Sequence, residues 1–171
     1  MRHTFIALVE DKPGVLNRVT TLFRRRAFNI ESLTVGHTER PGVSRMTIVL
    51  DADPASALRL VAHLYKLINV IQVEDVADRP TVNRDLALVK VHAAGDARAD
   101  VLRVVDETRA HVVDSGDRTM TVEITGEPEH VDRVIGRLEP LGMVEMVRTG
   151  VVAMARGDQA LRMAESKFRS P

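Results

Sequence analysis

The 171-residue chain contains no cysteine, which excludes a disulfide scaffold, a cysteine nucleophile, a thiolate zinc site and an iron–sulfur cluster. Aromatic residues make up 3% of the chain, so flat ligands and unpaired bases have few rings on which to stack. Basic and acidic side chains balance at 24 each, so no net charge draws the chain to a polyanion. We therefore expect no nucleic-acid partner.

Long hydrophobic runs are also absent, and none approaches the roughly 20 residues of a membrane-spanning helix. The chain begins MRHTFIALVEDKPG, where acidic residues come too early for a signal peptide. Hydrophobic residues nevertheless make up 44% of the chain, an ordinary fraction for a globular protein. These features predict a folded cytoplasmic protein with no membrane partner, and the length allows two small domains.

The first half of the chain predicts the element order βαββαβ. Apolar residues alternate or run together where we expect strands, and recur at helical spacing where we expect helices. The six elements are expected over residues 4–9, 15–23, 28–35, 44–50, 54–67 and 70–76. This order is typical of the ferredoxin-like fold, in which an antiparallel sheet carries both helices on one face and leaves the other face free.

The same element order recurs in the second half, after a polar, proline-containing stretch over 77–83 that we take as the domain boundary. Its elements are expected over residues 86–91, 99–109, 111–113, 120–124, 128–138 and 143–147. The sequence thus predicts an α+β protein of two tandem ferredoxin-like βαββαβ domains. We place them at residues 1–77 and 84–157, followed by a polar tail over 158–171.

Catalytic motifs are missing from the sequence. The six histidines are scattered, with no i,i+4 pair for a helical metal site and no G-x-S-x-G or phosphate-loop motif. His92 and His111 of the second domain could still converge in space, and a metal site there is left open. The acidic pairs that begin at Glu10 and Glu74 sit at strand ends, where solvated charge is the simplest interpretation. We predict a non-enzyme with no catalytic residue, metal or cofactor in this chain.

The run Arg24-Arg25-Arg26 raises the alternative of nucleic-acid binding. It closes the first predicted helix, where cations complement the helix dipole. We therefore interpret the run as a solvated face. An RNA-binding ferredoxin-like domain would also need aromatic residues on its strands, and Phe5 and Phe28 are too few.

The most informative segment joins the first strand to the first helix and contains Asp11 and Gly14. Backbone N–H groups at a helix start attract a carboxylate, and Asp11 could hold an ammonium group beside them. Gly14 would allow close approach of a ligand to the backbone. A free α-amino acid carries both charges. The alternative is that Asp11 caps the helix and Gly14 only makes a turn.

The segments DKPGVLNRVTTLFRRRAFNIESLTVG, SRMTIV, LINVIQV, LALVKV and TGVVAMARGD resemble the regulatory small subunit of acetolactate synthase, also called acetohydroxyacid synthase. The resemblance implies that the first domain is an ACT domain and that the chain has no active site of its own. It further implies a catalytic large-subunit partner that uses thiamine diphosphate, magnesium and FAD. Such subunits activate that partner and confer feedback inhibition by branched-chain amino acids, usually valine.

The resemblance also implies where the amino acid binds, at an interface between the ACT domains of a homodimer. Matched position by position, one chain supplies Asp11, Gly14, Val15 and Leu16, and the other supplies Asn29 and Ile30. Asp11 and the amide oxygen of Asn29 would hold the ammonium group, backbone N–H groups near Gly14 to Leu16 would take the carboxylate, and Ile30 would border the isopropyl group.

One residue departs from the family pattern, because Ala27 stands where glycine is usual. This exchange would alter the end of the first helix if the position requires a positive φ. The alternative function that we retain is a free-standing ACT-domain amino-acid sensor that regulates another enzyme or transcription.

Overall fold

The computed structural model describes residues 1–158, 160 and 161. These residues form two compact units. The first unit contains Met1–Val82 together with the described residues from Val151 onward, and the second contains Asn83–Gly150. In the described part of the chain, no helix is long and apolar enough to cross a membrane.

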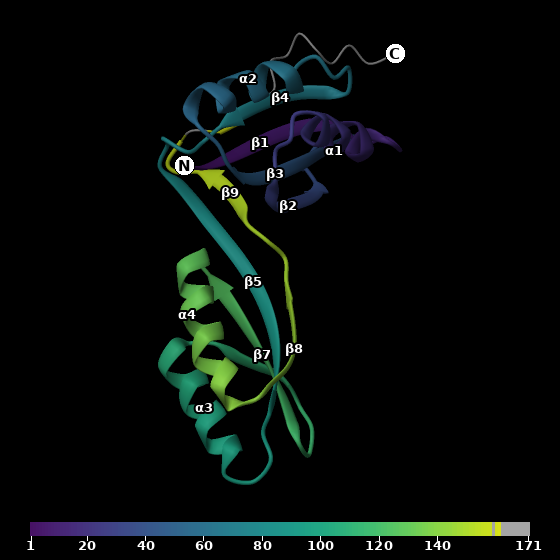
Figure 1. The fold of residues 1–171 in the computed structure, drawn as a ribbon. Coiled ribbons are helices and arrows are strands. Elements are labelled where there is room, and N and C mark those ends of the chain that lie inside the picture. The colour runs from purple at the N-terminus through teal and green to yellow at the C-terminus, as the bar shows by residue number, and fades with distance from the viewer. Residues whose placement is uncertain (159, 162–171) are drawn as a thin grey trace. The chain divides into compact units, whose positions relative to one another are not determined.

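The first unit has the predicted βαββαβ order. Its elements are β1 (Arg2–Glu10), α1 (Val15–Arg25), β2 (Ile30–His37), β3 (Val43–Asp51), α2 (Pro54–Leu64) and β4 (Val70–Asp75). The strands form an antiparallel sheet in the order β2-β3-β1-β4, and both helices cover the same face of this sheet (Figure 1). The predicted ferredoxin-like fold is therefore confirmed for this unit.

Alternation and helical spacing explain the core of the first unit. Phe5, Ala7 and Val9 alternate along β1 and are fully buried against the helices. The helices contribute side chains at helical spacing, namely Val15, Val19, Phe23, Ala57, Leu60 and Leu64. Helix α2 begins at a conventional cap, where the Asp53 carboxylate accepts a hydrogen bond from the Ser56 N–H at 2.9 Å.

Ala27 follows the end of α1 and adopts the left-handed conformation, with φ of 56°. The Phe28 N–H donates to the Phe23 carbonyl at 3.1 Å, and the two phenyl rings pack edge to face with centroids 6.3 Å apart. This arrangement is a Schellman motif, which favours glycine at the left-handed position because any Cβ is strained there. The position therefore does require a positive φ, and alanine occupies it.

Replacing Ala27 with Gly is expected to raise the free energy of unfolding by about 0.5–1 kcal/mol. Relief of the left-handed strain outweighs the larger conformational entropy of glycine in the unfolded chain. Urea denaturation of the two proteins under identical conditions measures this difference. A matched Ala52→Gly variant, at a residue without positive φ, should be neutral or destabilising. A less stable Ala27→Gly variant would show that the helix end is not strained.

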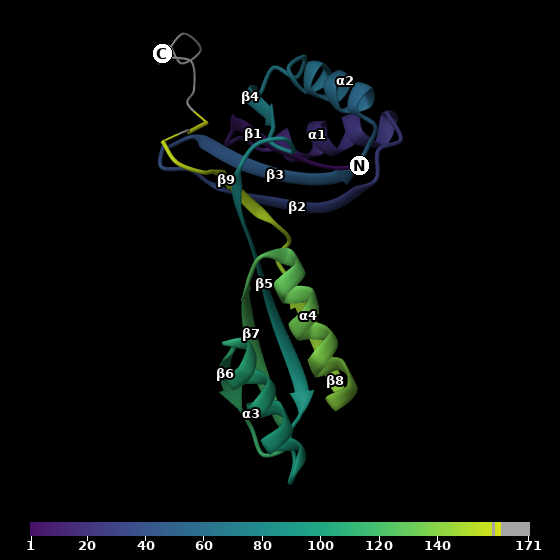
Figure 2. The same ribbon diagram turned by 90° about the vertical axis from the view of Figure 1, so that its left-hand side faces the viewer.

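The outer face of the first sheet is not free, contrary to the expectation from sequence. Ile6, Leu8 and Val43 on this face are buried, and Ala153 and Leu161 pack against them. The Val151 N–H donates to Ser32 Oγ at 3.0 Å, and the Arg45 guanidinium donates to the Ala153 carbonyl at 2.6 Å. The chain thus covers this face with its own C-terminal segment (Figure 2).

This C-terminal segment includes a strand that the sequence analysis did not predict, β9 (Val152–Ala155), which pairs with β5. The sequence predicts this segment as part of the second domain, over 84–157, whereas its contacts place it with the first unit. Its five apolar residues after Gly150 are too short a run to show which sheet they join. The predicted tail over 158–171 lies mostly outside the described residues.

The second unit repeats the fold. Its elements are β5 (Thr81–His92), α3 (Ala97–Thr108), β6 (His111–Ser115), β7 (Thr119–Gly126), α4 (Pro128–Leu138), a 3₁₀ turn (Glu139–Leu141) and β8 (Met143–Arg148). The antiparallel strand order is β6-β7-β5-β8, equivalent to that of the first unit. The two units divide between Val82 and Asn83, inside β5. The stretch predicted to be irregular, 77–83, therefore ends within a strand.

Candidate functional site

The loop between β1 and α1 is fixed to the hairpin that joins β2 and β3. The Asp11 N–H donates to the Gly42 carbonyl at 2.8 Å. The Asp11 carboxylate lies 3.2 Å from Nδ1 of His37, the last residue of β2. Because 44% of the Asp11 side chain is still exposed, the carboxylate can also contact a ligand.

Gly14 adopts the left-handed conformation, with φ of 83° and ψ of −6°, directly before α1. Its conformation alone is a reason for glycine at this position. A Cβ at Gly14 would meet no atom within 4 Å, so the space beside the backbone is also open. The structure therefore supports both roles of Gly14, as a turn residue and as a point of ligand approach.

Helix α1 starts without a side-chain cap, in contrast to α2. The Val15 N–H donates to the Lys12 carbonyl at 3.3 Å, and the first bond within the helix joins the Arg18 N–H to the Gly14 carbonyl. No acceptor within the described residues takes the N–H groups of Leu16 and Asn17. Asp11 is thus not the helix cap, and two N–H groups at the positive end of the helix dipole remain as donors for an anion.

The side chains of the predicted loop residues differ in exposure. Val15 is buried in the core of the unit, whereas 43% of Leu16 is exposed. Val15 therefore holds the helix on the sheet, and its side chain does not line the open space beside Gly14. Only Leu16 of the two can offer apolar surface to a ligand.

A hydrogen-bond network that the sequence did not predict holds the loop from the other side. Asn69 donates from Nδ2 to the Glu10 carboxylate at 2.5 Å and accepts at Oδ1 from Arg18 at 2.7 Å. The hydrogen bond from Asn69, followed by that from Lys12, lowers the pKa of Glu10. Glu10 is therefore not a simply solvated carboxylate, because it ties the end of β1 to α1. Its partner lies 59 residues away in the sequence, so no local pattern indicated the contact.

The other half of the predicted site lies at the opposite end of the sheet. Ile30 pairs with Leu50, which in turn pairs with His3 near the start of β1, whereas the loop follows Glu10 at the end of β1. The seven steps from His3 to Glu10 span about 23 Å at the usual rise of a strand. Within one chain, Asn29 and Ile30 therefore cannot share a small ligand with Asp11 and Gly14.

Strand β2 forms one edge of the sheet and pairs only with β3 among the described residues. An edge strand readily pairs with its own copy around a two-fold axis, and the two strands are then antiparallel. Such pairing sets the start of one β2 beside the end of the other. Since His37 at the end of β2 contacts Asp11, a second copy would bring Asn29 and Ile30 to the loop that the first copy provides.

His92 and His111, which the sequence analysis considered as metal ligands, do not lie close together. His92 pairs with Thr119 and His111 with Glu123, on opposite sides of β7. The four steps between Thr119 and Glu123 alone span about 13 Å. Over residues 1–158, 160 and 161, no group of three or more metal-ligating side chains is close enough to hold an ion.

Two units, each an antiparallel sheet with two helices in the order βαββαβ, define the class of tandem ferredoxin-like α+β proteins. Residues 5–72 match the family model described as the AHAS small subunit-like ACT domain, and residues 84–157 match that of the small subunit of acetolactate synthase. The chain belongs to the family of acetolactate synthase small subunits.

Proteins that match nearly the whole chain are also acetolactate synthase small subunits. The acetolactate synthase small subunit of Mycolicibacterium smegmatis is 44% identical over 163 residues, covering 95% of this chain and 96% of that protein. A probable small subunit from Archaeoglobus fulgidus is 44% identical over 159 residues, covering 93% and 99%. The crystal structure of the Thermotoga maritima small subunit matches with a TM-score of 0.86 at 34% identity, covering 93% and 99%. The resemblance found in the sequence is confirmed.

Proposed function

We propose that this protein activates the catalytic large subunit of acetolactate synthase and makes it sensitive to feedback inhibition by valine or another branched-chain amino acid. Membership of the small-subunit family supports this proposal. The chain itself is proposed to be non-catalytic. Thiamine diphosphate, magnesium and FAD would belong to the catalytic partner, which would supply the carbon–carbon bond chemistry.

The loop and the helix start fit the two charges of an amino acid. The N–H groups of Leu16 and Asn17 would donate to its carboxylate, and the exposed Asp11 carboxylate would hold its ammonium group. From a second copy, the Asn29 amide oxygen would accept from the ammonium group and Ile30 would contact the aliphatic side chain. Of the N–H groups near Gly14 to Leu16 that the resemblance implies for the carboxylate, the Val15 N–H already donates to the Lys12 carbonyl.

The single observation that carries this proposal is the separation of the two halves of the site. Each half lies at a different end of one sheet, and both lie next to the open edge β2. A homodimer through β2 would complete two equivalent sites, each built from both chains. The binding of an effector would then stabilise the dimer, which gives the ligand a physical means of control.

The alternative of a free-standing ACT-domain sensor has no observation in its favour. The second unit matches the small-subunit model over residues 84–157, and a sensor of another enzyme would not require this unit.

A reconstitution assay tests the proposed function. The full chain is purified and added to its own large subunit, and acetolactate formation is measured with and without valine. We expect no turnover by the chain alone, a several-fold increase in large-subunit activity, and inhibition by valine that requires the chain. The large subunit alone with valine is the control. Acetolactate formation by the isolated chain, or unchanged activity of the large subunit, would contradict the proposal.

A further inference from the structure

The helix layer of the first unit contains no acidic residue. This layer comprises residues 15–28 and 54–69, which form α1, α2 and the turns that follow them. It carries six cations, namely Arg18, Arg24, Arg25, Arg26, Arg59 and Lys66. The whole chain has no net charge, so this surface, which we call the basic helix layer, is a local concentration of one sign.

The cations of the basic helix layer are not locked in ion pairs, although Arg18 acts electrostatically on Glu10, and Arg59 on Asp53 at the start of α2. Within the described residues none of the six forms an ion pair, and the groups that Arg18 and Arg59 contact are the neutral side chains of Asn69 and Ser56. The helices of the second unit differ, because Arg103 pairs with Asp100 at 2.7 Å and Arg137 pairs with Glu107. A merely solvated helix face mixes signs in this way, whereas the basic helix layer does not.

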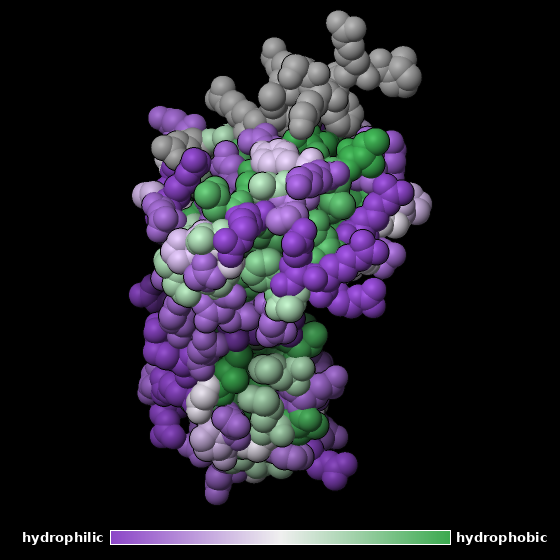
Figure 3. Space-filling model, turned by 45° about the horizontal axis from the view of Figure 1, so that its top comes forward, coloured by the Kyte–Doolittle hydropathy of each residue, from purple (hydrophilic) through white to green (hydrophobic). Residues whose placement is uncertain are grey.

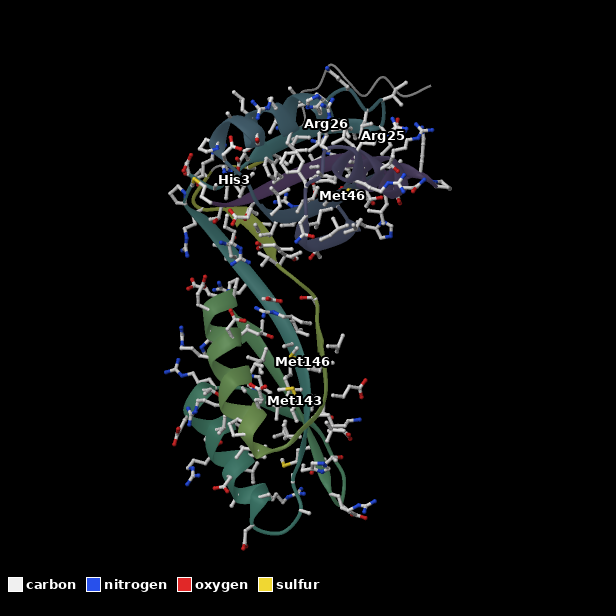
Figure 4. The ribbon with its side chains drawn as sticks, in the orientation of Figure 1. His3, Arg25, Arg26, Met46, Met143 and Met146 are labelled. Carbon is white, nitrogen blue, oxygen red and sulfur yellow. The ribbon has the colours of Figure 1, made fainter. Side chains whose placement is uncertain are left out.

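A hollow of about 450 Å³ lies between the two helices. It is lined by Asn17, Arg18, Thr21, Leu22, Arg25, Arg26, His63 and Leu67. Figure 4 labels Arg25 and Arg26 near the end of α1. Three arginines thus line this hollow, and guanidinium groups bind carboxylates and phosphates in a bidentate manner.

Large aliphatic side chains are exposed within the same layer. Ile68 is 87% exposed and Leu58 is 74% exposed, the two highest values among the large hydrophobic residues of the described chain. Figure 3 shows hydrophobic surface next to strongly hydrophilic surface over the first unit. Exposed aliphatic residues on a face that also carries arginines are typical of protein interfaces, where apolar contacts accompany ion pairs.

We propose that the basic helix layer docks on an acidic, partly apolar surface of the catalytic large subunit, an inference that rests on the proposed function. Carboxylates of the partner pair with Arg25, Arg26 and Arg18, and Leu58 and Ile68 make the apolar contacts. The layer is the remaining broad face of this unit, because the C-terminal segment covers the outer face of the sheet. Nucleic acid is disfavoured, since phosphates do not use aliphatic contacts and the chain has few rings for bases.

The test compares two pairs of neutral substitutions in the full chain. One variant carries Arg25→Gln and Arg26→Gln, and its matched control carries Arg103→Gln and Arg137→Gln on the helices of the second unit. Each is titrated into the large subunit, and the concentration for half-maximal activation is measured at low and high ionic strength. We expect the first variant to need at least about tenfold more protein at low salt, and the control to match the unchanged chain.

Further measurements separate docking from folding and from the proposed function. Valine binding by the isolated first variant should be unchanged, and Leu58→Gln with Ile68→Gln should weaken activation without any effect of salt. If the unchanged chain activates the large subunit, and the Arg25/Arg26 and Leu58/Ile68 variants reach half-maximal activation at the same concentration as the unchanged chain, the docking surface is wrong. The proposed function then still stands. If the unchanged chain fails to activate, the proposed function itself fails. Binding of DNA through Arg25 and Arg26 with unimpaired activation would also overturn the docking surface.

Discussion

Replacing Gly14 with Asp is expected to weaken valine binding by about a hundredfold or more, while Gly14→Asn retains most of the affinity. Both side chains enter the open space beside Gly14, where a Cβ meets no atom within 4 Å. Only Asp places a negative charge beside the N–H groups proposed to hold the carboxylate of the effector. Repulsion between like charges in a poorly solvated site costs several kcal/mol. Isothermal titration calorimetry with valine measures the difference.

The Asn variant is the control for backbone strain. With helical dihedral angles at Gly14, the fold would accept Asp there without strain. Its φ is 83°, however, so an Asp or an Asn side chain at this position is strained by about 1 kcal/mol. Asn and Asp tolerate this region better than other non-glycine residues, and they differ here only in charge. Equal loss of valine binding in both variants would show that Gly14 serves backbone geometry alone. Full binding in both would show that the effector carboxylate does not lie at this loop.

Replacing Val35 with Lys is expected to convert a homodimer to monomers at micromolar concentration. Val35 lies on β2, the open edge strand, and is 43% exposed. Pairing of β2 with its own copy would place each introduced lysine within the paired strands, and lysine on an edge strand opposes edge pairing. We expect the dimer dissociation constant to rise at least about tenfold, and valine binding to weaken with it. Sedimentation velocity over a range of concentrations measures this change.

Val144→Lys provides the matched control for Val35→Lys. Val144 lies on β8, an edge strand of the second unit, and is 50% exposed. The same charge there should leave the dimer intact if the first unit carries the interface. A dimer that survives Val35→Lys but dissociates with Val144→Lys would place the interface on the second unit.

Local patterns predicted nearly all the elements because most of them are long and bounded by turn residues. The end of α1 illustrates the limit, since the sequence showed alanine in place of glycine but not the left-handed backbone that makes the exchange costly. The C-terminal segment illustrates a second limit. Its five apolar residues fit either sheet, and only packing against Ile6 and Leu8 decides where the segment lies.

The residues of the candidate site stay a prediction, and the contacts that hold them in place could not be predicted from the sequence. Spacing identified the acidic loop, and resemblance added Asn29 and Ile30. The uncapped start of α1 and the network from Asn69 to Glu10 depend on contacts between residues far apart in the sequence. The separation of the two halves follows from strand register, which fixes that Ile30 lies level with His3 rather than with Glu10.

Complementation between two damaged chains tests most directly whether each effector site is built from two copies. Gly14→Asp damages the loop half, and Asn29→Lys damages the other half by placing a cation beside the effector ammonium group. Neither variant alone should bind valine. After mixing and exchange of equal amounts, half of the dimers contain one chain of each kind, and each of these has one intact site. Calorimetry should then find about a quarter of the normal number of sites. No recovery of binding in a mixture shown to contain mixed dimers would contradict a site shared between chains.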